Sequence, residues 1–340
     1  MAQLWTDIVD PATLTGYARE SLSDMERAKG SLASFLPNRM VSDQVVRFTV
    51  GRNGLIEEAK FRAYDAEPEP GTGPSGKRKT IELPAIGQVI PVSEYNQLRG
   101  RSAPDDLVRE MLLRAAEFVV VSVSDRLEQM RGHVLVHGKA VIDQDNFQSV
   151  DDFERKPELS PTAATLWTES GADPIGDLKL WRDLYEDENG TTPGAMVVSR
   201  EIVTALANAP QFQVTMAGGG SRPATEADVQ AILMANGLPP MTVFTRRTYS
   251  GPVLPKDRVL LLPPAVDTDD WTGTALGSTF WGQTLTAEDP AWGIAPLDRP
   301  GIVLGAYRNP KPPMIAEIIS DAIGLPVLED PNLSLVAKVL

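Results

Sequence analysis

The residues closest to a ligand-binding pattern lie between Gly71 and Lys79, in the sequence GTGPSGKRK. A phosphate-binding loop of the Walker type needs a glycine, four residues, Gly-Lys and then Ser or Thr. Gly71, Gly76 and Lys77 fit this pattern, but Arg78 occupies the position of the magnesium ligand. A strand should precede such a loop and a helix should follow it, whereas EPEP precedes this stretch and TIELPAI follows it. We interpret it as a basic loop tip.

The other residues that could do chemistry form no recognisable site. His133 and His137 share parity, so on a strand they would face the same side, but no Asp or Glu stands beside them at a ligating spacing. The acidic run Asp267, Asp269 and Asp270 lacks a second carboxylate cluster, and no serine lies in a Gly-x-Ser-x-Gly elbow. We therefore predict structural histidines, no catalytic residues, no metal and no cofactor.

Composition places the chain among soluble multi-domain proteins. It has 340 residues, of which 42% are hydrophobic and 23% charged. No run of 18 apolar residues could span a membrane, and the N-terminus MAQLWTDIVD lacks the basic region of a secretory signal. The absence of cysteine excludes disulfides and thiolate chemistry.

The net charge of −14 is unevenly distributed, with −2 over residues 1–132 and −12 over residues 133–340. A protein that grips phosphate backbones usually presents a strongly basic face. Sequence-specific nucleic-acid binding is therefore disfavoured.

The first elements along the chain are an arm and an extended excursion. Residues 1–40 predict an arm with a helix that opens at Pro11 and ends near Gly30. Its apolar residues are too sparse for a core of its own, so it needs another surface to lie on. Residues 45–92 predict two strands around a tip rich in Pro and Gly. Because an isolated two-stranded ribbon is marginally stable in water, we expect a neighbour to stabilise it.

A long helix and a mixed α+β body follow. Residues 104–131 predict a helix of about 42 Å at 1.5 Å per residue, with Gly132 as its stop. We then expect a hairpin with Gly138 near its turn and a polar connection over 147–161. Further helices are predicted at 174–185, 200–210 and 225–237, and strands at 195–199, 241–249, 257–263, 301–309, 312–320 and 333–340.

Several short pieces of the sequence carry a resemblance to a known family. They are Phe35-Leu36-Pro37-Asn38-Arg39, the excursion from Val45, the segment Leu83-Pro84-Ala85-Ile86 through Ile90-Pro91-Val92-Ser93-Glu94, and Arg99-Gly100. The long helix, the hairpin, the Ala172-Asp173-Pro174-Ile175 helix, a buried strand with its helix and a Gly-rich aromatic stretch follow in order. In the order and spacing of these pieces, the chain resembles the lambda-type major capsid (head) protein family of tailed bacteriophages.

That resemblance implies an α+β fold of the Hong Kong 97 (Johnson) type. The expected parts are an N-terminal arm at 1–43, an extended E-loop β-ribbon at 44–91, a peripheral domain at 92–132 and 296–325 with a long spine helix at 104–131, and an axial domain at 133–295 and 326–340.

The resemblance also implies a function without catalysis. It implies a major capsid protein whose hexamers and pentamers form an icosahedral head around packaged double-stranded DNA, assembled in the host bacterial cytoplasm and located in the virion. An acidic surface suits a container that must release DNA. Implied partners are further copies of the chain, a separately encoded scaffolding protein and a portal, with DNA held non-specifically and no membrane. The sequence does not decide whether a decoration protein binds. Lys77, Arg78 and Lys79, at the E-loop tip, are the candidate contacts between subunits. No covalent crosslink between subunits is predicted.

Other classes stay open on the sequence alone. A cellular nanocompartment (encapsulin-like) shell protein of the same fold would show much the same pattern. A portal or tail-tube subunit is another structural alternative, and an acidic enzyme with a nucleotide site at Gly71–Lys79 is the catalytic one.

Overall fold

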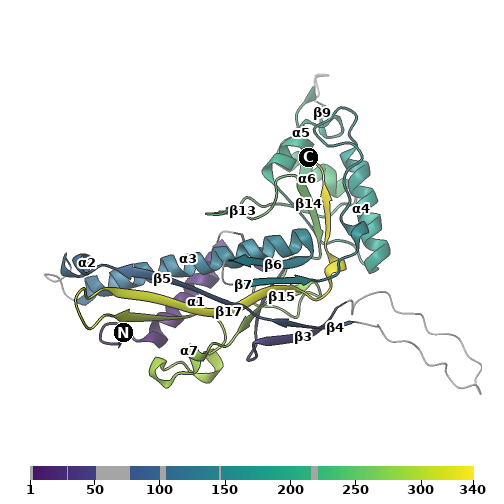
Figure 1. Cartoon of the computed structure of the whole chain (residues 1–340). Helices are drawn as coiled ribbons and strands as arrows, with labels where there is room; N and C mark the ends of the chain where they lie inside the picture. The colour runs from purple at the N-terminus through teal and green to yellow at the C-terminus, as the bar shows by residue number, and fades with distance from the viewer. Residues whose placement is uncertain (1–2, 29, 51–76, 100–104, 145–146, 216–220) are drawn as a thin grey trace, which may run out of the picture.

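A computed structural model describes residues 3–28, 30–50, 77–99, 105–144, 147–215 and 221–340. These residues form two bodies (Figure 1). An elongated spine body follows one long helix, and a mixed α/β body stands over the C-terminal end of that helix. A narrow hairpin leaves the spine body on the same side.

One long strand, β17, organises the sheet of the spine body. Its first half pairs antiparallel with β16 on one edge and with β5 on the other, and its second half pairs with β15. β1 extends the sheet beyond β16, and β2 pairs parallel with β15. The strands are β1 (Gln3–Leu4), β2 (Asn38–Met40), β5 (Ala85–Val92), β15 (Gly277–Gly282), β16 (Val303–Arg308) and β17 (Ala316–Leu328).

Helices α1 (Pro11–Ala28) and α3 (Asp105–His137) pack on this sheet. The buried side chains of α3 recur every three or four residues, as the 3.6-residue period of a helix requires. At most 1% of each is exposed: Leu112, Ala116, Val119, Val120, Val123 and Leu127. They share one apolar core with Leu14 and Ala18 of α1 and with Ile318 of β17. The predicted arm is thus docked, and the surface it lies on belongs to its own chain.

The α/β body contains a four-stranded sheet in the order β11-β8-β14-β18. Its strands are β8 (Ala195–Val198), β11 (Met241–Val243), β14 (Arg258–Leu262) and β18 (Leu335–Lys338). Its helices are α4 (Pro174–Asn189), α5 (Arg200–Asn208) and α6 (Glu226–Ala235). Each helix has a side-chain N-cap, from Asp173, Ser199 and Thr225 respectively, which satisfies an otherwise unpaired backbone N–H. These three helices confirm the prediction.

Four hairpins and several short helices complete the described residues. The hairpins are β3 (Val45–Val50) with β4 (Lys77–Glu82), β6 (Lys139–Gln144) with β7 (Phe147–Asp152), β9 (Val214–Thr215) with β10 (Ser221–Arg222), and β12 (Arg247–Thr248) with β13 (Gly251–Pro252). The short α-helices are α2 (Glu94–Arg99) and α7 (Leu285–Glu288). The 3₁₀ helices are η1 (Leu32–Ser34), η2 (Pro157–Leu159), η3 (Pro210–Phe212), η4 (Pro290–Trp292), η5 (Pro296–Asp298) and η6 (Pro331–Leu333). Among the described helices, none is long and apolar enough to cross a membrane.

The end of α3 differs from the prediction. The helix passes through Gly132 and ends after His137, where Gly138 takes a positive φ of 65°. Gly132 serves close packing instead, because a Cβ there would lie 2.4 Å from the carbonyl oxygen of Val253. The predicted hairpin around Gly138 is therefore wrong: its first half is helical.

Two predicted strand assignments also change. β6 pairs with β7, so the first residues of the expected polar connection at 147–161 form a strand. β5, which the prediction puts in the ribbon, pairs with β17 along its whole length, and its Ile86 and Ile90 pack against the core under α3. Within the described residues, the ribbon therefore consists of β3 and β4 alone.

Candidate functional site

The root of the ribbon is fixed to its own chain. In the β3–β4 register Val46 lies opposite Ile81, and Phe48 lies opposite Lys79. The side chains of Val46, Phe48 and Ile81 are 3–8% exposed and belong to the same core as Ile142 of β6. Strands β3 and β4 thus leave the body from an anchored base, and the rest of the predicted loop, residues 51–76, lies outside the described residues.

The three predicted contact residues begin strand β4 and do not act alike. Lys79 is engaged within the chain: its Nζ lies 3.0 Å from Oε1 of Glu154 and donates to the carbonyl oxygen of Asp152. Arg78 is exposed, and Lys77 opens the strand opposite Val50. Strand β4 begins at Lys77, where the Walker pattern requires a helix. The alternative of a nucleotide-binding loop at Gly71–Lys79 therefore lacks the secondary structure that such a loop needs.

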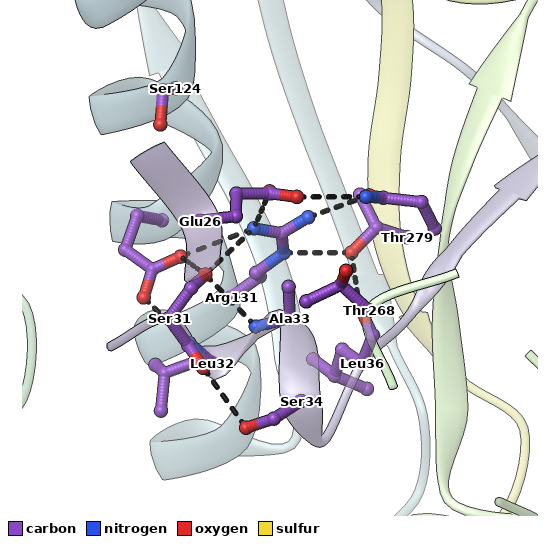
Figure 2. Close-up of polar contacts among 12 residues, drawn as sticks. Glu26, Ser31, Leu32, Ala33, Ser34, Leu36, Ser124, Arg131, Thr268 and Thr279 are labelled. Atoms are coloured by element: carbon purple, nitrogen blue, oxygen red, sulfur yellow. Dashed lines mark hydrogen bonds and ion pairs between the residues drawn. The ribbon is translucent and has the colours of Figure 1, made fainter. Parts of the chain in front are cut away.

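The most elaborate polar site is buried where α1, η1, β2, α3 and β15 meet (Figure 2). At its centre, Arg131 of α3 is 1% exposed. Its Nη1 donates to Glu26 at 2.6 Å and to Glu128 at 3.2 Å, and its Nε donates to Thr279 at 2.9 Å. Its Nη2 donates to Oδ1 of Asn38 at 2.8 Å. Every nitrogen of the guanidinium therefore has a partner.

Both carboxylates of this site are also fully engaged. Glu128, 0% exposed, accepts from the Ser31 hydroxyl and from the Leu32 backbone N–H, each at 2.7 Å. Glu26, 3% exposed, accepts from Nδ2 of Asn38 at 2.9 Å. Burial by itself would lower the pKa of Arg131, but the two carboxylates outweigh it and raise that pKa above its ordinary value. We call these four residues, Glu26, Asn38, Glu128 and Arg131, the Arg131 cluster.

The Arg131 cluster joins the arm to the spine helix and is not an active site. Its two carboxylates and its guanidinium are buried and hydrogen-bonded, so these groups are not free to accept a proton from a substrate or donate one to it. This site is not among those predicted from the sequence, although the sequence contains a signal for it. Ser124, Glu128, Arg131 and Leu135 follow a 4-3-4 spacing, which puts two charges on one buried helical stripe.

The two histidines lie on the last turns of α3, not on a strand. Their rings are 4.5 Å apart between centroids and tilted by 40°. Burial lowers the pKa of His133; burial, and then His133, Arg258 and Arg155, lower the pKa of His137. Among the described residues no group of three or more His, Asp or Glu could hold a metal ion.

One groove of about 850 Å³ opens beside α3, between the ribbon root, β5 and the β12–β13 hairpin. Phe118, Phe147 and Tyr249 are exposed on its walls. Between them lie amides such as Gln88 and Gln129. The groove combines exposed aromatic side chains with amides and with the charged residues Glu82, Asp125 and Arg126, a mixture that suits a binding surface.

Solved structures with the same arrangement of helices and strands identify the fold. A phage-related protein from Bordetella bronchiseptica matches with a TM-score of 0.60 and 14% identity, over 98% of this chain and 97% of its own. A protein assigned as the capsid protein of a prophage in Escherichia coli CFT073 matches with a TM-score of 0.60 and 14% identity, over the full length of both chains. No protein-family model and no curated sequence matches the chain.

The fold is therefore that of the phage capsid proteins, an α+β fold of the Hong Kong 97 type. The predicted resemblance is confirmed at the level of the fold.

Proposed function

We propose that this chain is a shell-forming subunit, the major capsid protein of a tailed bacteriophage. The observation that carries the proposal is the end-to-end match to the prophage capsid protein, with neither chain left over. A fold alone does not fix a function, so the parts of this molecule must also suit a shell. Three features of this molecule offer surface to a neighbouring copy: the elongated body, the anchored ribbon, and the exposed aromatic residues beside the ribbon root.

In the proposed shell the spine body is the peripheral domain and the α/β body is the axial domain. Axial domains gather around fivefold and quasi-sixfold axes as pentamers and hexamers, and repeated modest contacts make the closed shell stable. One part of the expected mechanism changes. Helix α1 packs on its own α3, so an arm that reaches under a neighbour is not part of this proposal for residues 11–28.

The proposed partners follow from the same assignment. They are a separate scaffolding protein and a portal during assembly in the host cytoplasm, a decoration protein on the finished virion, and double-stranded DNA inside it. A net charge of −14 favours loose enclosure of DNA over tight binding. The shell function requires no catalytic step and no cofactor.

The proposal assigns Lys77 and Arg78 to contacts between subunits, while Lys79 fixes the ribbon root. Reversing both charges, Lys77→Glu with Arg78→Glu, should leave the unfolding curve unchanged and reduce the yield of closed particles seen by negative-stain microscopy. The control is Lys179→Glu with Arg200→Glu on α4 and α5, which changes the net charge by the same amount elsewhere. Equal loss of particles in both variants would contradict the assignment.

A further inference from the structure

The β12–β13 hairpin reaches from the α/β body over the spine helix, and we call residues 246–253 the tongue (Figure 1). At its start, Nη2 of Arg246 donates to the hydroxyl of Ser124 and to Oδ1 of Asp125, each at 3.0 Å. The Arg246 side chain is only 6% exposed. A buried, charge-assisted contact of this kind is held more strongly than an exposed ion pair.

The tongue makes further contacts along α3. Nε2 of Gln129 donates to the hydroxyl of Thr248 at 2.6 Å and to the carbonyl oxygen of Gly251 at 3.2 Å. One turn further on, the Val253 carbonyl meets the bare backbone of Gly132. The contacted helix positions 125, 129 and 132 are spaced by four and three residues, so they form one line along a single face of α3.

This line of contacts starts beside the other attachment of the α/β body, because Val253 is part of the same apolar core as the end of α3, and it extends away from that attachment toward Asp125. Val134, Leu135 and Val136, at the end of α3, are at most 1% exposed and are part of the core of that body. The nine steps of 1.5 Å from Asp125 to Val134 put the Arg246 end of this line about 14 Å from the end of α3. The apolar contact at the helix end can act as a pivot, and the tongue then fixes the angle around it.

The tongue also lies next to the Arg131 cluster. Nη1 of Arg246 is buried without a hydrogen bond and lies 3.7 Å from Oε2 of Glu128. The carboxylate that orients Arg131 therefore attracts Arg246 as well. The tilt of the α/β body is thus tied to the residues that hold the arm.

We propose that the tongue is a latch that fixes the tilt of the α/β body on α3 and so sets the curvature that each subunit gives to the shell. The curvature part rests on the proposed shell function. The tilt part concerns the single chain and is testable without a shell.

The test compares neighbouring arginines. Arg246→Ala should speed hydrogen exchange of the tongue amides by roughly tenfold or more in the unassembled chain, because it removes bonds to a charged group. It should also change the radius of gyration measured by X-ray scattering. Arg247→Ala, at the exposed next position, should change neither. Thr248→Val, which keeps the side-chain shape and removes one Gln129 bond, covers the case in which Arg246→Ala fails to fold.

Particle diameters separate the two parts of the inference. The latch predicts that Arg246→Ala shells, imaged by electron microscopy, have a shifted or broader diameter distribution, while Arg247→Ala shells match the wild type. Unchanged exchange and scattering in both Arg246→Ala and Thr248→Val would overturn the latch. Faster exchange with unchanged diameters would overturn its role in curvature. A wild-type chain that builds no particles even with the scaffolding protein coexpressed would remove the shell function and the curvature with it, while exchange and scattering still decide the latch.

Discussion

Arg131 links the arm, the spine helix and the sheet through its hydrogen bonds to Glu26, Asn38 and Thr279. Among the described residues it is the one cation that touches both Glu26 and Glu128, and both carboxylates are sealed from water. Buried charges are tolerated only when each is paired and hydrogen-bonded, so removal of the shared partner leaves Glu26 with the Asn38 amide and Glu128 with Arg246, 3.7 Å away. The cluster is therefore a point where the arm, the spine helix and the sheet depend on one residue.

We predict that Arg131→Met lowers the free energy of unfolding by about 3–5 kcal/mol. Methionine keeps much of the side-chain volume but removes the ion pairs of Glu26 and Glu128 with Arg131. Urea unfolding followed by circular dichroism measures the change. Arg114→Ala is the control on the same helix: its exposed pair with Glu110 should contribute at most about 0.5 kcal/mol. Similar losses in the two variants would show that the Arg131 cluster does not stabilise the fold.

The histidine pair predicts a pH dependence of stability. Burial lowers the pKa of both rings in the folded chain, so the folded state binds fewer protons than the unfolded state near pH 6. Stability should be full above the unfolded value of about 6.5 and should fall as the pH drops through it. These are the only two histidines in the chain, so His133→Gln with His137→Gln should flatten urea midpoints between pH 7.5 and 5.5. An unchanged pH profile in that variant would contradict the assignment.

Elements with local signals could be predicted from the sequence, and elements fixed by distant contacts could not. Helices α4, α5 and α6 carry their own caps, so Asp173, Ser199 and Thr225 mark their starts wherever they pack. Gly132 suggests a helix end in the sequence, because glycine often follows the last turn of a helix. In the structure α3 continues through Gly132, and this glycine makes room for the carbonyl oxygen of Val253, more than a hundred residues away. The Arg131 cluster could not be predicted for the same reason, since its four residues come from three separate elements, α1, β2 and α3.

Two glycines in helices allow the effect of local helix propensity to be compared with that of a distant contact. Gly16 of α1 has open space where a Cβ would go, so Gly16→Ala should stabilise the chain by roughly 0.5–1 kcal/mol through helix propensity. Gly132→Ala makes the same chemical change on α3 but pushes against the Val253 carbonyl, and should destabilise by about 1–3 kcal/mol. Thermal unfolding compares the two. Equal stabilisation by both would mean that the tongue does not press on the helix.

The whole molecule is an elongated tile with surface left uncovered. Large apolar side chains stay exposed on the groove, such as Phe118 and Tyr249, and elsewhere on the surface, such as Tyr95 and Leu297. The order of strands and helices could be anticipated from motif order along the sequence. The path of the ribbon could not, because β5 belongs to the body sheet through pairing with β17, a strand more than two hundred residues later.

Sedimentation velocity of the full-length purified chain, with the fastest boundary imaged by electron microscopy, tests the central claim most directly. A shell subunit should sediment as a slow species together with a very large, homogeneous one, and the large species should be closed hollow particles. A single slow boundary at every protein concentration and ionic strength, even with the scaffolding protein coexpressed, would contradict the account.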